Sequence, residues 1–515
     1  MVPTRCRPLR SLSSRVVPLS RALSSIPVHS PRDGQLIGTL PDLSAAEVDD
    51  AVGAAAACAR SSWSHRSSVE SRAGSLRALA SALRDQTERL ASIESVDCGK
   101  PIAESRVDIG TCADLCEYYA EIAPTVLADG AALDVPDASF GARVVPYPAG
   151  VVAGVTPWNY PLMQAVCKVA PAIAAGCPML LKPSPLASLT CIELGKLGAE
   201  EASLPLGALS VLTGGPPDGV ADGAARLLSH PRVDYLSFTG STRGGREMLG
   251  ASAPLTRRTG LELGGKGAMI CFEDADVPSV LDWAMLGIFV TAGQICSATS
   301  RLLVHESIAP SLLERLRDAS CAIRMGDPLL EETQMGALIS QGAAERVRSE
   351  IERAQHDGSK LLCGGAEPPA LGKGVGGANL DGGYYVSPTI LVDVPLESAA
   401  WREEIFGPVL CVRTFASEEE AIALVNDSPY GLGHAVMSAD EERCERVAGA
   451  LEAGTVWINC NQAIWPQTPF GGWKASGFGV EWGEAGMHEY LRHKTITKAA
   501  AGHSWDYYGA AHSTE

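Results

Sequence analysis

Hydrophobic residues near the start of the chain recur at the spacing of an α-helix. An alanine-rich stretch begins after Ser44, and Glu47 follows that serine three residues later. A serine with a glutamate three residues on has the form of a capping box, which predicts the start of a helix. Leucines and alanines then recur at helical spacing, which favours more helix. We therefore expect two helices within residues 44–96 and a third over about residues 102–123.

From residue 143 onward the pattern changes, and short apolar runs alternate with stretches of helical periodicity. Strands that alternate with helices of about 10–15 residues predict a parallel sheet with helical crossovers. A second series of this kind begins after residue 264, with glycine-rich residues 372–383 as a loop. The expected strands of the first series are residues 151–155, 178–181, 208–212 and 233–238, and those of the second are 268–272, 301–304, 409–415, 435–437 and 455–459. The pattern predicts an α/β protein.

The composition limits the classes of protein to consider. A chain of 515 residues is too long for one hydrophobic core, so we expect at least two domains. The net charge of −18 argues against nucleic-acid binding, which requires clustered Lys and Arg. No apolar run reaches the roughly 18 residues of a membrane helix, so we expect no membrane span. The 15 cysteines are scattered without a CxxC pair, and HExxH is absent, so we expect reduced thiols and no metal site.

The first 30 residues differ from the rest of the chain. They contain five Arg, seven Ser and no acidic residue, and the first carboxylate belongs to Asp33. An Arg- and Ser-rich leader without acidic residues is typical of an organelle transit peptide. We expect residues 1–30 to be such a peptide, cleaved before Asp33, and the protein to be mitochondrial, with plastid or cytoplasm as alternatives. A disordered N-terminal tail is the other interpretation.

A cysteine beside a glycine-containing turn is the first candidate for catalysis. Cys296 follows Gly293, Gln294 and Ile295, and the pattern predicts that it opens a helix. A helix N-terminus lowers the pKa of a thiol and raises the fraction of nucleophilic thiolate. Glu262 precedes a Gly-Gly pair, where a carboxylate can act as a general base. Taken singly, a buried thiol and a solvated glutamate are the ordinary alternatives.

Two further motifs offer hydrogen-bond donors. Asn159 lies between two prolines, and a fixed Asn amide suits an oxyanion hole, although an ordinary turn asparagine is the alternative. Phe238 ends an expected strand, and Gly240, Ser241 and Gly245 lead into an expected helix. Such a strand–turn–helix segment presents N–H groups to an anion such as a pyrophosphate. The GxGxxG fingerprint of dinucleotide-binding folds is absent.

Together these motifs resemble the aldehyde dehydrogenase superfamily over about residues 41–497, nearly the whole chain. The interval of 34 residues from Glu262 to Cys296 is the interval that this family uses. Further segments carry the resemblance at residues 97–101, 182–184, 403–408, 426–431 and 469–472. The resemblance implies the aldehyde dehydrogenase fold and the oxidation of an aldehyde to a carboxylic acid.

The resemblance also implies roles for individual residues. Cys296 would be the nucleophile that forms a thioester, Glu262 the base, and Asn159 the oxyanion donor. The cofactor would be NAD, with NADP possible. Its binding residues would be Trp158, Lys182, Ser184, Gly240, Ser241, Gly245, Glu404 and Phe406. Pro185 stands where a ribose-binding glutamate is common, so weakened discrimination against NADP+ is expected.

Within the superfamily the chain looks most similar to plant-type betaine aldehyde and aminoaldehyde dehydrogenases, at residues 296–306, 442–447 and 456–462. This similarity implies an aromatic box for a cationic head group, and betaine aldehyde or an ω-aminoaldehyde as substrate. The aromatic residues would be Tyr160, Trp465 and Phe470. Cys167 and Val290 stand where tryptophans are expected, so the pocket should also admit bulkier or neutral aldehydes.

The resemblance implies a protein of three parts. A Rossmann-like NAD(P)-binding domain would cover residues 31–130 and 149–263, and an α/β catalytic domain would cover residues 264–483. A small β oligomerisation arm would use residues 131–148 and 484–500, followed by a tail at 501–515. Arms of this kind pair strands between subunits, so a homodimer or homotetramer is expected.

Three alternative functions stay open. A general aliphatic aldehyde dehydrogenase would share the catalytic residues. A CoA-acylating semialdehyde dehydrogenase would usually lack the base at Glu262. Outside the oxidoreductases, a cysteine acyltransferase or thiol hydrolase would have no need of Lys182, Gly240 and Glu404 together.

Overall fold

The first α/β series forms a six-stranded sheet with the order β19-β9-β8-β5-β6-β7. The computed structural model describes residues 25–128, 130, 132–215, 222–505 and 507–508. The strands are β5 (Val152–Thr156), β6 (Met179–Pro183), β7 (Leu209–Val211), β8 (Tyr235–Thr239), β9 (Arg258–Glu262) and the antiparallel β19 (Gly477–Phe478). The other five run parallel. Because β6 and β8 lie on opposite sides of β5, the carboxyl ends of β5 and β8 flank a topological switch point, where ligands bind in such sheets.

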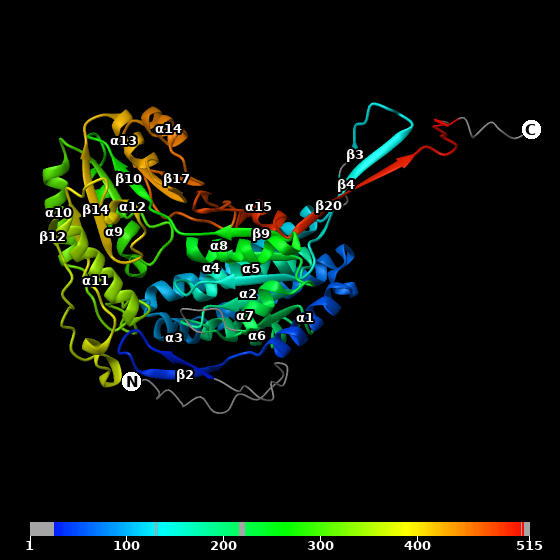
Figure 1. The fold of residues 1–515 in the computed structure, drawn as a ribbon, viewed down its shortest axis with the longest axis horizontal. Coiled ribbons are helices and arrows are strands. Elements are labelled where there is room, and N and C mark those ends of the chain that lie inside the picture. Colours follow the sequence, from blue (N-terminus) through cyan, green and yellow to red (C-terminus); the bar gives the residue numbers. More distant parts are fainter. Residues whose placement is uncertain (1–24, 129, 131, 216–221, 506, 509–515) are drawn as a thin grey trace, which may run out of the picture.

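Helices cover this sheet, and together they form the first lobe (Figure 1). They are α1 (Ala45–Ala59), α2 (Val69–Asp85), α3 (Thr87–Cys98), α4 (Ile102–Val126), α5 (Pro161–Ala175), α6 (Leu189–Glu200), α7 (Asp222–Ser229) and α8 (Thr242–Ser252). The expected capping box is present at α1, where Ser44 and Glu47 each accept a hydrogen bond from the other's backbone N–H. α5 ends at Gly176, whose φ of 88° only glycine adopts freely.

The second series forms a seven-stranded sheet with the order β12-β13-β14-β11-β10-β16-β17. Its strands are β10 (Ala268–Cys271), β11 (Arg301–His305), β12 (Lys360–Cys363), β13 (Thr389–Val392), β14 (Val409–Phe415), β16 (Gly433–Met437) and β17 (Thr455–Ile458). The helices of this second lobe are α9 (Val277–Phe289), α10 (Ala309–Cys321), α11 (Gln341–His356), α12 (Ala399–Arg402), α13 (Glu418–Asn426) and α14 (Glu441–Ala450). Only β12 pairs antiparallel to its neighbour.

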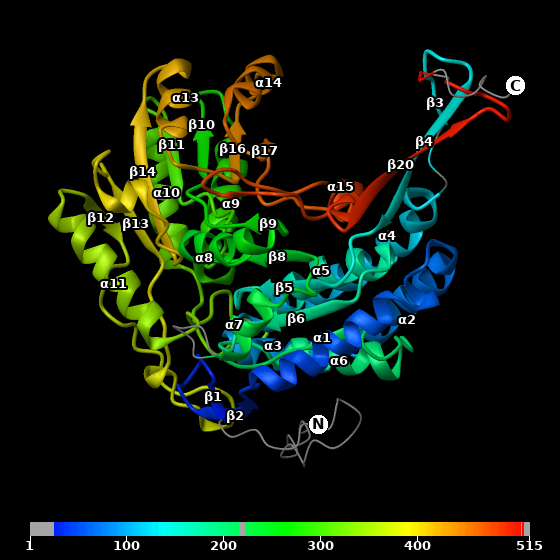
Figure 2. The same cartoon turned by 45° about the vertical axis from the view of Figure 1, so that its right-hand side comes forward.

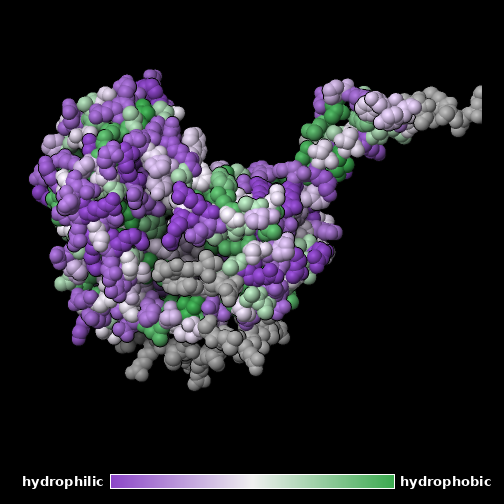
Figure 3. Space-filling model, in the orientation of Figure 1, coloured by the Kyte–Doolittle hydropathy of each residue, from purple (hydrophilic) through white to green (hydrophobic). Residues whose placement is uncertain are grey.

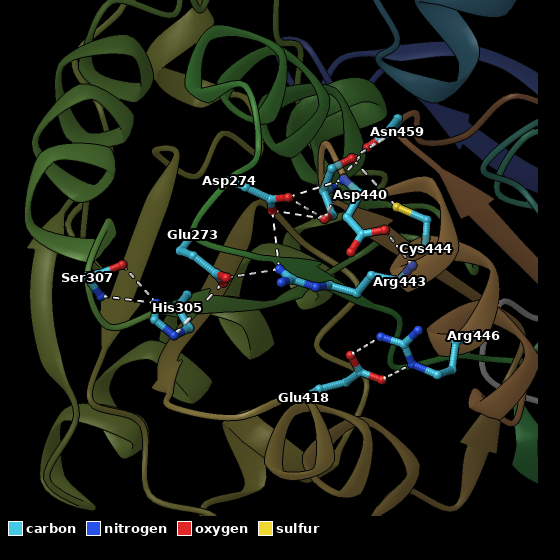
Figure 4. Close-up of polar contacts among 11 residues, drawn as sticks. Glu273, Asp274, His305, Ser307, Glu418, Asp440, Arg443, Cys444, Arg446 and Asn459 are labelled. Atoms are coloured by element: carbon cyan, nitrogen blue, oxygen red, sulfur yellow. Dashed lines mark hydrogen bonds and ion pairs between the residues drawn. The ribbon is translucent and has the colours of Figure 1, made fainter.

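Polar side chains join the carboxyl ends of β10 and β16 to α14 (Figure 4). The Asp274 carboxylate accepts hydrogen bonds from the Ser438 hydroxyl at 2.8 Å and from Arg443 at 3.3 Å. Glu273 pairs with the same guanidinium at 3.1 Å, and Asn459 accepts from the Ser438 N–H at 3.0 Å. Because these groups satisfy one another, we regard the cluster as a structural clamp of the second lobe.

Three antiparallel strands form an arm that projects from the first lobe (Figures 1 and 2). They are β3 (Ala132–Leu133), β4 (Phe140–Pro148) and β20 (Leu491–Ala499), with β4 in the middle. Nine residue pairs join β4 to β20, from Leu491↔Pro148 to Ala499↔Phe140. The short α15 (Gly483–His488) precedes β20 and packs against α5. Of the expected tail, His503 and Trp505 place their rings against Phe140.

The structure describes only the last residues of the expected leader, residues 1–30. Residues 1–24 lie outside the described residues. Residues Ser25–His29 form β1, which pairs antiparallel with β2 (Leu36–Pro41). The expected leader of residues 1–30 therefore includes β1, a strand of the folded chain in which Val28 is buried.

Membrane spans, cysteine pairs and metal-ligand clusters can be examined in the described residues. No helix among them combines the length and hydropathy needed to cross a bilayer. In the same residues every cysteine is free, and no three His, Cys, Asp or Glu side chains gather as metal ligands do. The small sheet of β15 (Tyr430–Gly431) with β18 (Trp473–Lys474) lies beside β19, so residues before 483 contribute to both lobes.

Candidate active site

The candidate residues of the first lobe follow the carboxyl ends of its parallel strands. Asn159 comes three residues after the end of β5, and Lys182 lies at the end of β6. Gly240 and Ser241 follow β8, and Glu262 ends β9. Because parallel strands bring their carboxyl ends to one edge of a sheet, all of these groups lie along that edge, on both sides of the switch point.

Cys296 lies in a turn between the 3-10 helix η4 (Val290–Gly293) and β11, so the expectation that it opens a helix is wrong. The turn has left-handed backbone at Thr291, Ala292 and Gly293, which stops a helix from continuing. Burial and the charges of Glu404 and Glu262 raise the pKa of the Cys296 thiol to about 12. In this form the cysteine is a neutral thiol.

Asn159 lies beside the segment that carries the cysteine. Its Nδ2 donates to the Gln294 carbonyl at 2.7 Å, and its Oδ1 is buried without a partner. The Gln294 side chain is held by the Thr291 carbonyl at 3.1 Å and by the Ile339 N–H at 2.9 Å. The Asn159 amide is therefore fixed two residues from Cys296, which suits a donor to an oxyanion.

Glu262 is a buried carboxyl with no hydrogen-bond partner on either oxygen. Desolvation raises its pKa well above the ordinary value, and the charge of Glu481 raises it further, while Lys168 acts in the opposite sense. The turn after β8 lies beside this residue, because the Gly240 N–H donates to the Glu262 backbone carbonyl at 3.0 Å. A buried carboxyl of raised pKa holds a proton more readily than a solvated one, as a residue that takes a proton from water must do.

Lys168 and Glu481 form a buried ion pair that the motif analysis missed. The lysine ammonium also donates to Ser237 at 3.0 Å and to Thr239 at 2.8 Å, and Thr239 donates to Glu481 at 3.2 Å. A charged residue inside the apolar α5 was the available signal, because lysine is rarely buried without a partner. The pair is therefore anchored to β8, and its two charges act on the Glu262 carboxyl in opposite senses.

The start of α8 has the geometry of an anion site. Ser241 caps the helix and accepts from the Gly244 N–H at 3.1 Å. A Cβ on Gly240 would lie 2.6 Å from the Phe238 ring, and a Cβ on Gly245 would lie 2.6 Å from Leu263. Both glycines are therefore required by close packing, as expected for a backbone that approaches a phosphate.

Lys182 and Ser184 stand at the end of β6. Burial lowers the pKa of Lys182 to about 8, and its ammonium donates to the Pro183 carbonyl at 3.2 Å. The Ser184 N–H donates to the Thr156 carbonyl at 3.0 Å, which holds the loops after β5 and β6 together.

The second lobe contributes Glu404 and Phe406. Glu404 accepts from the Gly265 N–H at 3.0 Å, and burial raises its pKa to about 7. Phe406 has a φ of 57°, and its ring lies edge-on to Trp158 with the centroids 5.3 Å apart. The two lobes thus bring Trp158, Phe406 and Glu404 to the side of the cysteine turn.

The three expected substrate residues differ in their surroundings. Phe470 is buried in the same hydrophobic cluster against which Cys296 packs, while Trp465 is 61% exposed. The Tyr160 hydroxyl lies 3.1 Å from the Thr291 hydroxyl. The Lys100 ammonium lies 3.7 Å from the centroid of the Tyr160 ring, so an internal cation already covers one face of that ring.

The chain matches known proteins over nearly its full length. The profile of the Aldehyde dehydrogenase family matches residues 19–496. Aminoaldehyde dehydrogenase 2, peroxisomal, of Pisum sativum is 45% identical over 489 residues, which are 94% of each chain. Betaine aldehyde dehydrogenase, chloroplastic, of Beta vulgaris is 43% identical, over 94% of this chain and 95% of that one. A crystal structure of betaine aldehyde dehydrogenase from Staphylococcus aureus in complex with NAD+ superposes with a TM-score of 0.88, at 34% identity, over 94% of this chain and 93% of that one.

These relatives overturn the mitochondrial expectation. The names of the plant relatives place those proteins in the peroxisome or the chloroplast. The composition of the leader misled the assignment, because an Arg- and Ser-rich segment without acidic residues separates organelles poorly. The two α/β lobes, the projecting β arm and these similarities have one explanation: the chain is a member of the aldehyde dehydrogenase family and has its fold.

Proposed function

We propose that this aldehyde dehydrogenase oxidises its substrate with NAD+ through a thioester on Cys296. The observation that carries the proposal is the convergence of Cys296, Asn159 and Glu262 from three separate segments: Asn159 bonds to the backbone two residues before Cys296, and the charge of Glu262 acts on the Cys296 thiol. A nucleophile, a fixed amide donor and a carboxyl of raised pKa are the groups that acyl chemistry at cysteine requires.

In the proposed mechanism the Cys296 thiol gives its proton to solvent water, and its sulfur adds to the aldehyde carbon. The Asn159 amide, with the Cys296 N–H, donates to the oxyanion that forms. NAD+, when bound, would supply the oxidation by accepting the hydride of the former aldehyde carbon, which would leave a thioester on Cys296. Glu262 then takes a proton from water, the water attacks the thioester carbon, and the carboxylic acid leaves as Cys296 regains its thiol.

The residues of the first lobe fit a dinucleotide. Gly240 and Ser241 would hold the pyrophosphate at the start of α8, and the partly satisfied Lys182 would reach the adenosine ribose with Ser184. Gly245 keeps α8 against Leu263, so the helix start remains at the switch point. From the second lobe, Glu404 would bind the nicotinamide ribose, with Phe406 and Trp158 beside the ring.

For the substrate we propose betaine aldehyde or an ω-aminoaldehyde. Relatives with these names and the aromatic residues Tyr160, Trp465 and Phe470 support the proposal. Aromatic faces attract such cations by about 0.5–2 kcal/mol per contact. Since Lys100 covers one face of Tyr160, the substrate cation would meet the other face.

We also propose that the arm joins subunits into a homodimer or homotetramer. The arm projects from the body and exposes two sheet edges, β20 and β3, in the monomer (Figures 1 and 2). Unpaired strand edges favour association with a second chain.

The experiment that tests the proposed function measures NADH absorbance with a panel of aldehydes and NAD+. We expect the wild-type protein to favour betaine aldehyde or an ω-aminoaldehyde over the neutral isostere 3,3-dimethylbutanal. Cys296→Ser should lose turnover while it still binds NAD+, because the hydroxyl is a much weaker nucleophile. If Cys296→Ser keeps its turnover within about tenfold of wild type, the activation barrier has risen by no more than ~1.4 kcal/mol, and Cys296 is not the nucleophile.

A further inference from the structure

Trp482 has a backbone conformation that is nearly restricted to glycine. Its φ is 62° and its ψ is 169°. This region is costly for any residue with a side chain, and such strain concentrates at functional sites. The side chain is also almost fully buried, with 5% of its surface exposed. A large aromatic residue is therefore held at a position where glycine would be free of strain.

Hydrogen bonds hold the backbone on both sides of Trp482. Glu481 and Phe470 exchange N–H···O bonds of 2.8 Å, and the Gly483 N–H donates to the Pro466 carbonyl at 2.9 Å. These bonds tie the segment to the loop that carries the two aromatic residues expected at the substrate. The strained conformation is thus determined by the surrounding structure.

The indole of Trp482 lies against Cys167. It is close enough to lower the pKa of the Cys167 thiol, although burial raises that pKa more, and Cys167 is fully buried within α5. Both residues belong to the hydrophobic cluster that contains Phe470 and against which Cys296 packs. Cysteine is much smaller than the tryptophan expected at position 167, and the Trp482 indole is a large side chain in the same buried cluster.

We propose that Trp482 is a specificity-determining residue, whose indole forms the inner wall of the aldehyde pocket in place of a large side chain at position 167. It limits the width of the acyl group that can reach Cys296. This inference rests on the proposed aldehyde oxidation and names the residue that sets its size selectivity.

The test compares kcat/KM for benzaldehyde with kcat/KM for propanal in four proteins. Trp482→Leu should raise the benzaldehyde-to-propanal ratio about tenfold, since pocket contacts of this size discriminate substrates by such factors. The double variant Trp482→Leu with Cys167→Trp restores the volume from the other side and should return the ratio toward wild type. Trp401→Leu is the matched control, because Trp401 is a buried tryptophan of the second lobe at 1% exposure. It should leave the ratio unchanged.

The outcomes separate a pocket wall from ordinary core packing. If Trp482→Leu slows both aldehydes equally, as the control does, Trp482 is a packing residue and the inference is wrong. If Trp482→Leu does not fold, Trp482→Phe replaces it and should give an intermediate rise in the ratio; no rise would overturn the inference. Absence of aldehyde oxidation by the wild type would overturn the proposed function, and this inference with it.

Discussion

At the scale of single residues, burial raises the pKa of Glu262 and the charge of Lys168 opposes that rise. Burial and Glu481 raise that pKa, and Lys168 lowers it. The base works only when deprotonated, so thioester hydrolysis should accelerate as the pH rises through the pKa of Glu262. Lys168→Met removes the opposing charge, raises the pKa further and should move the rising limb of the kcat–pH profile to higher pH by about one unit.

Lys168→Arg keeps the charge and serves as the control, with the limb expected to stay near that of the wild type. An unchanged profile in Lys168→Met would show that another group limits hydrolysis.

Sequence motifs identified Glu262, Asn159 and Cys296 as candidates because their neighbours are glycines and prolines, which act locally. They could not predict the raised pKa of Cys296, which arises from burial and from the distant Glu404. They also missed Glu481, which lies 313 residues from Lys168.

At the scale of elements, Gly245 allows α8 to pack closely against Leu263, the residue that follows β9. Gly245→Ala places a Cβ 2.6 Å from the Leu263 side chain and should lower the free energy of unfolding by about 1–3 kcal/mol, as overpacking does. It should also weaken NAD+ binding, because the helix start moves. Gly250→Ala in the same helix meets nothing within 4 Å and should instead stabilise the protein by about 0.5–1 kcal/mol.

Urea unfolding and a NAD+ titration of the two variants measure both effects. Equal stability of the two variants would show that α8 shifts without cost.

The buried strands of this lobe were predictable because each is a short apolar run between helices; β8 (Tyr235–Thr239) is an example. β9 escaped prediction, since its start is exposed and polar at Arg258. The cysteine turn escaped as well, because left-handed backbone at Thr291 and Ala292 has no clear sequence signal.

At the scale of the whole molecule, the two lobes were predictable and the boundaries between them were not. The two alternating series form two mainly parallel sheets, as expected, and each sheet has one antiparallel strand. However, β19 returns from the second series to pair with β9, so the expected catalytic domain of residues 264–483 contributes a strand to the first sheet. Pairing between segments about 215 residues apart depends on tertiary packing, which a local pattern does not record.

The arm has one apolar and one polar face, and this difference predicts how subunits associate. Phe140, Ala142 and Val144 lie on one face of the arm, while Arg143 and, from β20, Lys494 and Lys498 lie on the other. Figure 3 shows hydrophobic residues along the arm where it leaves the body. Val144→Asp places a charge on the apolar face and should shift the mass measured by light scattering from the oligomer toward the monomer, with a dissociation constant raised at least about tenfold, or ~1.4 kcal/mol. Arg143→Asp changes the charge on the opposite face of the same strand and should leave the mass nearly unchanged. Should Val144→Asp keep the wild-type mass at micromolar concentration, or should both variants dissociate alike, the apolar face of the arm would not be the contact that joins the subunits.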